Sequence, residues 1–149
     1  MKSFLLSLFL LLFIGNQVQA QTGWTKTYDN GLVVSAEVYA SSAGKQILEQ
    51  GGNAVDAAVA VQFALAVTLP RAGNIGGGGF MMIRLSDGTT KALDFREIAP
   101  LRATADMYIR DGEFQPELSQ QGILASGVPG VVDGMITAHK RYGRLPLET

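Results

Sequence analysis

The sequence contains no cysteine and only one histidine, His139. Its stability must therefore come from packing rather than from disulfide bonds, and a metal site has no support. Twelve Lys and Arg residues nearly balance 13 Asp and Glu residues, and no run of five or six like charges occurs. These absences exclude the basic surface that nucleic-acid binding or an anionic membrane would require.

Phosphate-binding motifs are also missing, although Gly76–Gly79 are four glycines in a row. No Gly-Lys-Ser/Thr sequence occurs, and no placement of Gly-x-Gly-x-x-Gly fits residues 73–88. The glycines follow an expected helix and precede an expected strand, which reverses the order in phosphate loops. We do not expect nucleotide binding. Tight packing against a helix and a ligand wall both remain as explanations of the missing side chains.

The N-terminus has the pattern of a secretory signal. Lys2 precedes an apolar run, Phe4–Ile14, and Val18-Gln19-Ala20 has the small-residue ending of such signals. As a helix the apolar run would span about 16 Å, against roughly 30 Å of hydrocarbon, which disfavours a membrane anchor. We predict a signal peptide at residues 1–20 and a periplasmic or secreted mature chain, 21–149, with no membrane attachment.

The first elements of the mature chain are predicted to be a strand and a helix. Leu32–Val34 has the composition of a short strand. A helix is expected at Ala40–Gln50, with Ser41 or Ser42 near its start and Gly51 as its stop.

A second helix is expected at Ala54–Val67, before Pro70. Asn53 and Asp56 have the spacing of a capping box. The helix is so apolar that we expect it to be buried nearly all round in the core.

Two strands are expected next, Phe80–Leu85 and Lys91–Arg96, joined by a tight turn at Ser86–Thr89. The first strand is almost continuously apolar. This favours a strand covered on both faces, as in a multilayer sandwich.

The remaining segment predicts a short helix near Thr104–Ile109, polar turns at residues 111–121, a loop at Ser126–Gly130 and a helix at Val131–Tyr142. Leu145–Glu148 resembles the beginning of a further helix. We therefore expect the chain to be a fragment of a longer protein.

Arg96 is the main candidate for binding a ligand. At a strand end, its planar guanidinium could hold a carboxylate through two parallel hydrogen bonds. An ordinary ion pair with Asp94 or another acid is the competing interpretation. Asp94 and Glu97 are expected on opposite faces of the strand, so they do not form a pair of catalytic carboxylates.

Two other residues have side chains that can serve as catalytic groups. His139 lies near the end of the last expected helix, where a solvated side chain interacting with the helix dipole is expected rather than a general base. Ser126 lacks the Gly-x-Ser-x-Gly sequence of a nucleophile elbow.

Three separated motifs together resemble the gamma-glutamyltranspeptidase family: Gly51–Ala60, Ala72–Phe80 and Asp94–Glu97. Ala125–Gly130, followed by a helix, fits the same family. Their order and spacing match as well, and the resemblance runs from about Gly31 to Pro146.

The resemblance implies an α+β fold, part of a four-layer αββα sandwich of the N-terminal-nucleophile hydrolase type. It also implies an exported precursor that cuts itself into large and small subunits and needs no cofactor. The nucleophile is the N-terminal threonine of the small subunit, which forms a gamma-glutamyl enzyme. The acyl group then passes to water, an amino acid or a peptide, and glutathione is the expected type of substrate.

This chain resembles only the first part of the large subunit, so the nucleophile is expected beyond Thr149 and the chain alone is expected to be inactive. Arg96 matches the family arginine that binds the alpha-carboxylate of the glutamyl group. A related acylase acting on glutaryl amides and a non-catalytic secreted module with the same scaffold remain as alternatives.

Overall fold

The computed structural model describes residues 27–148. The chain divides into two units, residues 1–31 and 32–149, and all of the helices and strands described below belong to the second. The signal peptide predicted at residues 1–20 lies outside the described residues. Within residues 27–148, no helix combines the length and the apolar character that crossing a membrane requires.

Helix α2, Val38–Glu49, begins two residues earlier than predicted, and no side chain caps its start at Glu37. Gly51 follows the helix with φ of 90°, as expected for a helix stop. The strand predicted at Leu32–Val34 is wrong, since this segment pairs with no strand in the described chain. Val33 instead packs on α2, close enough that a Cβ added to Gly44 would lie 2.8 Å from its Cγ1.

Helix α3, Ala54–Thr68, has the predicted capping box. The Asn53 side chain accepts hydrogen bonds from the N–H groups of Val55 and Asp56, and the Asp56 carboxylate accepts one from the N–H of Asn53 at 2.8 Å. The prediction that this helix is buried nearly all round is wrong, because Val67, near the end of α3, is 81% exposed among the described residues. A short helix, α4 (Pro70–Gly73), follows.

The predicted hairpin is confirmed as antiparallel strands β1, Phe80–Arg84, and β2, Thr90–Asp94. The N–H of Leu85 donates to the carbonyl of Thr89 at 2.8 Å, and Gly88 has φ of 85° in the turn. Asp87 accepts a hydrogen bond from the N–H of Thr89 at 2.8 Å, which lowers the pKa of its carboxyl below the ordinary value.

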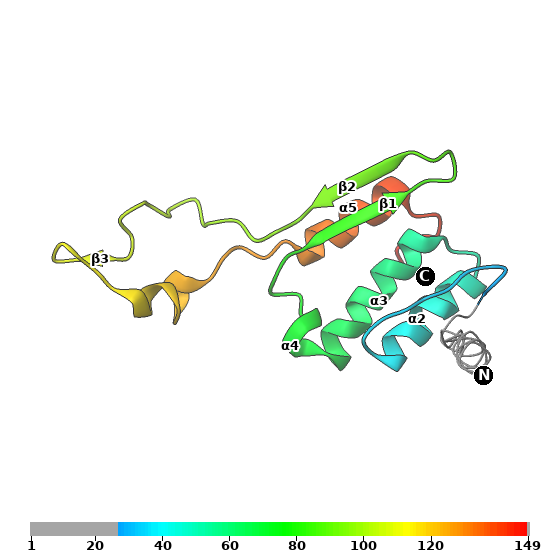
Figure 1. The fold of residues 1–149 in the computed structure, drawn as a ribbon, viewed down its shortest axis with the longest axis horizontal. Helices are drawn as coiled ribbons and strands as arrows, with labels where there is room; N and C mark the ends of the chain where they lie inside the picture. Colours follow the sequence, from blue (N-terminus) through cyan, green and yellow to red (C-terminus); the bar gives the residue numbers. More distant parts are fainter. Residues whose placement is uncertain (1–26, 149) are drawn as a thin grey trace, which may run out of the picture. The chain divides into compact units, whose positions relative to one another are not determined.

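Helices α3 and α5 pack on one face of the hairpin (Figure 1). Helix α5 spans Val131–Tyr142, as predicted. The core has two adjoining clusters, and Met81 contacts both: Val55, Ile83 and Ala138 in one, Val59, Val131 and Met135 in the other.

The other face of the hairpin exposes large apolar side chains. Phe80 is 65% exposed and Met82 is 70% exposed. The expectation that β1 is covered on both faces is therefore not met within the described residues, where only one face is packed.

The segment between the hairpin and α5 contains short elements: β3 (Ile109–Arg110), β4 (Glu113–Phe114), and the 3₁₀ helices η2 (Pro116–Ser119) and η3 (Ile123–Ala125). The helix predicted near Thr104–Ile109 is wrong. Its backbone forms separate turns and then enters β3, because Asp111 and Gly112, with φ of 54° and 82°, make a hairpin turn that pairs β3 with β4. The mixed helix and strand class is confirmed, and the four-layer sandwich stays a prediction.

Candidate substrate-binding site around Arg96

Arg96 lies two residues beyond β2, in a backbone that is held on both sides of it. Before Arg96, Phe95 extends the hairpin ladder, since its N–H donates to the carbonyl of Gly79 at 3.0 Å and its carbonyl accepts from the N–H of Gly79 at 3.3 Å. After Arg96, Ile98 pairs with Val128 through two backbone hydrogen bonds of 2.8 and 3.3 Å. The attachment point of the Arg96 side chain is therefore fixed by main-chain pairing.

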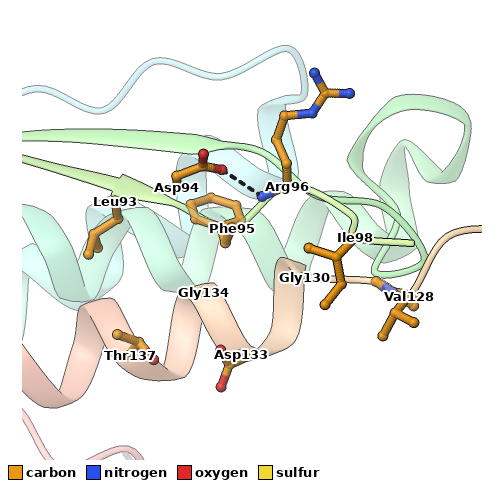
Figure 2. A pocket seen from close by; sticks show the side chains of 11 residues that line it. Leu93, Asp94, Phe95, Arg96, Ile98, Val128, Gly130, Asp133, Gly134 and Thr137 are labelled. Atoms are coloured by element: carbon orange, nitrogen blue, oxygen red, sulfur yellow. Dashed lines mark hydrogen bonds between the residues drawn. The ribbon is translucent and has the colours of Figure 1, made fainter. Parts of the chain in front are cut away.

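The Arg96 side chain points away from the helices. Figure 2 shows Phe95 directed toward Gly134 of α5, whereas the Arg96 guanidinium extends away from α5. The Arg96 side chain is 65% exposed. This follows from strand alternation, which sends successive side chains to opposite faces. The arginine thus projects on the side opposite to the packed core.

Asp94 helps to fix the main chain of Arg96, whereas the guanidinium makes one weak contact, with Glu97. Asp94 does not form the ion pair considered above: its Oδ1 accepts a hydrogen bond from the N–H of Arg96 at 3.0 Å. The guanidinium approaches Glu97, with 3.9 Å between Nε and Oε2, and both side chains are partly exposed. Because such exposed pairs contribute little free energy, the guanidinium can exchange this contact for a ligand carboxylate.

A cavity of about 420 Å³ lies between the end of β2 and the first half of α5. Phe95, Ile98, Asp133 and Thr137 line it, and Arg96 borders it. Figure 2 shows the guanidinium pointing away from Asp133 and Thr137. The cavity and the guanidinium therefore face different sides, and a carboxylate bound by Arg96 would lie outside this cavity.

His139 is largely but not fully buried, which corrects the expectation of a solvated side chain. Its side chain is 12% exposed, and its Nε2 lies 3.4 Å from Oδ1 of Asp56, which is itself 3% exposed. Asp56 also accepts hydrogen bonds from the N–H of Arg144 at 3.0 and 3.1 Å. This cluster joins the start of α3 to the end of α5, so we assign it a structural role.

The sequence revealed only part of the Asp56 cluster. The spacing of Asn53 and Asp56 indicated the helix cap, but no local pattern indicates partners 83 to 88 positions away. The sequence offered one further signal: Asp56 is one of only two polar residues in a helix predicted to lie in the core, so a buried partner for it was to be expected.

The other candidate residues from the sequence do not form a catalytic site. Ser126 is exposed, and its hydroxyl donates at 3.5 Å to the carbonyl of Gly122. Among the described residues, no three His, Asp or Glu side chains are grouped to hold a metal ion. Asp94 lies in β2 and Glu97 beyond its end, so strand geometry does not pair the two carboxylates.

Comparisons with known proteins agree with the motifs. Residues 40–149 match the family model of gamma-glutamyltranspeptidase. The chain is 58% identical over 116 residues to the glutathione hydrolase proenzyme of Pseudomonas sp. (strain A14), which covers 77% of this chain and 20% of that protein. It is 54% identical over 118 residues to the glutathione hydrolase proenzyme of Escherichia coli (strain K12), covering 78% and 20%. The chain therefore spans about a fifth of the length of these relatives.

The fold agrees with a solved structure. The crystal structure of Helicobacter pylori gamma-glutamyltranspeptidase superimposes with a TM-score of 0.78 and 53% sequence identity, covering 83% of this chain and 36% of that chain. Sequence and fold thus match over most of the described residues, and the chain belongs to the gamma-glutamyltranspeptidase family.

Proposed function

We propose that this chain is the N-terminal part of an exported gamma-glutamyltransferase and glutathione hydrolase. Two relatives carry the name glutathione hydrolase proenzyme at 58% and 54% identity. The substrate is glutathione or another gamma-glutamyl compound, and the partner is a small subunit cut from the same precursor. No cofactor is required.

The position of Arg96 is the observation that carries the proposal for this part of the protein. Its backbone is paired on both sides, and its guanidinium extends into the open, with one weak contact to Glu97. Such a group can bind the alpha-carboxylate of a gamma-glutamyl substrate in the bidentate geometry that a lysine cannot reproduce.

The chemical step is assigned to the part of the protein that follows residue 149. There the N-terminal threonine hydroxyl adds to the gamma-carbonyl carbon, and its proton passes to the threonine amine. Hydrogen-bond donors stabilise the oxyanion, and the leaving amine departs with the proton. Water or an amino group then attacks the gamma-glutamyl ester and releases the threonine. Arg96 holds the far end of the glutamyl group during both steps.

The open face of the β1–β2 hairpin supports the proposed sandwich. Phe80 and Met82 are large and exposed, and strand alternation places them on the face opposite to Met81 and Ile83, which pack in the core. Figure 2 shows that the Arg96 guanidinium also extends away from α5. We assign this face to the contact with a second sheet that completes an αββα arrangement. Arg96 then lies at the edge of the interface between the two sheets, where a substrate can enter.

The proposal that the protein is exported rests on its N-terminal sequence. The charged start, the short apolar run and the ending at Ala20 support removal of residues 1–20 and a periplasmic or secreted location. N-terminal sequencing of the exported protein tests this, and a start before Gln21 would count against cleavage at that site.

The activity is tested on the purified full-length protein with gamma-glutamyl p-nitroanilide, with and without a dipeptide acceptor, alongside intact-mass measurement. We expect two subunits, release of p-nitroaniline and a faster release with acceptor. Turnover of glutaryl p-nitroanilide alone would support the acylase alternative. A single uncut chain without turnover would support a non-catalytic module.

A further inference from the structure

Two glycines in different segments lie against the backbone that carries Arg96. A Cβ added to Gly78 would lie 2.6 Å from the Cα of Arg96 and 2.6 Å from the amide nitrogen of Glu97. A Cβ added to Gly130 would overlap the carbonyl oxygen of Phe95 and lie 2.8 Å from its carbonyl carbon. Both contacts are with main chain, which cannot rotate aside as a side chain can.

Space, and not backbone conformation, explains why these positions are glycine. Gly130 has φ of −110° and ψ of −13°, which any residue can adopt. Gly78 is also outside the left-handed region that favours glycine. The missing side chains therefore let two other segments approach residues 95–97 closely.

Neighbouring glycines extend the same contact. Gly134 lies directly beneath the Phe95 side chain (Figure 2). A Cβ on Gly79 would lie 3.0 Å from the Phe95 ring. A Cβ on Gly127 would lie 3.0 Å from the Cβ of Glu97. The two glycine-bearing segments are also joined to each other, since the N–H groups of Gly130 and Val131 both donate to the carbonyl of Gly77.

We propose that these glycines position Arg96 for substrate binding. The glycine cluster comprises Gly77, Gly78, Gly79, Gly127, Gly130 and Gly134. The inference rests on the proposed function of Arg96 and extends it to residues that touch no substrate. Because the guanidinium is at the end of a long side chain, a small rotation of the main chain at residues 95–97 displaces it by a larger distance. A misplacement of about 1 Å can cost roughly 100-fold in activity.

The test compares Gly78→Ala and Gly130→Ala with Gly76→Ala in the full-length protein. Gly76 is the matched control, because it belongs to the same glycine run and its added Cβ would meet only the exposed side chain of Asn74, at 3.3 Å. We expect the KM for gamma-glutamyl p-nitroanilide to rise roughly 10- to 100-fold in the first two variants. In Gly76→Ala we expect a change below about twofold.

A double-mutant cycle with Arg96→Ala separates positioning from a general structural effect. If the glycines act through Arg96, Gly78→Ala changes KM by less than about twofold once the arginine is gone. If Gly78→Ala raises KM equally with and without Arg96, the inference is overturned. A wild-type KM in Arg96→Ala alone would instead overturn the proposed function of Arg96, so the two failures are distinguishable.

Gly127→Ala keeps the inference testable where Gly78→Ala and Gly130→Ala do not mature. Its added carbon would lie 3.0 Å from the Cβ of Glu97, farther than the 2.6 Å contacts of Gly78, so the main chain needs to shift less. We expect roughly a two- to fivefold rise in KM that disappears in the Arg96→Ala background. An unchanged KM in Gly127→Ala, in protein that matures normally, overturns the inference.

Discussion

Arg96 combines a fixed main chain with an exposed guanidinium. The hairpin ladder and the Ile98–Val128 bridge hold its backbone, and Asp94 accepts a hydrogen bond from its N–H. The charged group itself makes one distant contact, to Glu97. This arrangement fixes the main chain of the arginine before a ligand arrives, which reduces part of the entropy cost of binding a carboxylate.

Arg96→Ala in the full-length protein should weaken recognition of gamma-glutamyl substrates by about 2 to 5 kcal/mol, because a desolvated charge pair loses one partner. Arg96→Lys should not restore it, since an ammonium lacks the two-pronged donor geometry. Steady-state kinetics with gamma-glutamyl p-nitroanilide measure both effects. Wild-type kinetics in both variants would sink the assignment.

Asp56 joins parts of the chain that are far apart in sequence. Its buried carboxylate accepts hydrogen bonds from the N–H groups of Asn53 and Arg144 and lies beside His139. Such an acceptor is costly to remove, because the partly buried N–H groups around it are left without a partner.

Asp56→Ala should therefore lower the free energy of unfolding by about 2 to 4 kcal/mol. Glu49→Ala is the control: it removes an exposed acid that pairs with Lys45, and should cost below about 0.5 kcal/mol. Urea unfolding followed by circular dichroism measures both. Equal stability of the two variants would show that the Asp56 cluster contributes little to the fold.

The hairpin turn depends on the backbone conformation of Gly88. Its φ is 85°, and an added Cβ would meet nothing within 4 Å. Gly88→Ala should thus cost about 1 to 2 kcal/mol through backbone strain alone.

Gly88→Asn should cost less than Gly88→Ala, since asparagine tolerates the left-handed region better than alanine does. Urea unfolding of the two variants gives the comparison. An alanine variant as stable as the wild type would mean that the turn relaxes to another conformation.

Elements with strong local signals were predictable. Alternating and apolar runs around Asp87-Gly88 identified the hairpin, and the Asn53–Asp56 cap identified the start of α3. The start of α5 followed from the loop at Ser126–Gly130 that precedes it. These signals act within a few residues, and the structure confirms them.

The predictions that are wrong concern segments whose structure depends on distant partners or on residues with positive φ. Leu32–Val34 has strand composition, yet Val33 packs on α2 and the segment has no strand to pair with among the described residues. At Thr104–Ile109, the turn at Asp111 and Gly112 draws the chain into a small hairpin. A solvated His139 is expected from its place near a helix end, and this is wrong because its partner, Asp56, lies 83 positions earlier in the sequence.

Arg96 itself was predictable as a candidate, while its surroundings were not. Its place at a strand end and its motif indicated a carboxylate-binding role. The approach of Gly78 and Gly130 to its main chain depends on how the hairpin, the loop at 126–130 and α5 pack together. No spacing in the sequence determines that packing.

Within residues 32–148, one face of the β1–β2 hairpin is covered by helices and the other face is open. Phe80 and Met82 are exposed on the open face, although both are apolar. Since the chain spans about a fifth of the length of its relatives, we assign the cover of this face to the remainder of the full-length protein.

Met82→Glu should lower the stability of the full-length protein by about 2 to 4 kcal/mol or prevent its maturation, because the proposed sandwich would bury the carboxylate between two sheets. Arg84→Glu, at the outer end of the same face, replaces one charge by another and should be tolerated. The yield of processed subunits and urea unfolding measure the difference. Normal maturation and stability of Met82→Glu would mean that this face stays open to solvent.

The most direct test of the central claim compares two substrates that differ only at the alpha position. Gamma-glutamyl p-nitroanilide carries the alpha-carboxylate, and its alpha-carboxamide analogue does not. If Arg96 binds this carboxylate, the full-length wild type prefers the first substrate by roughly 30-fold or more in kcat/KM, and Arg96→Ala abolishes most of that preference. An undiminished preference in Arg96→Ala would contradict the account.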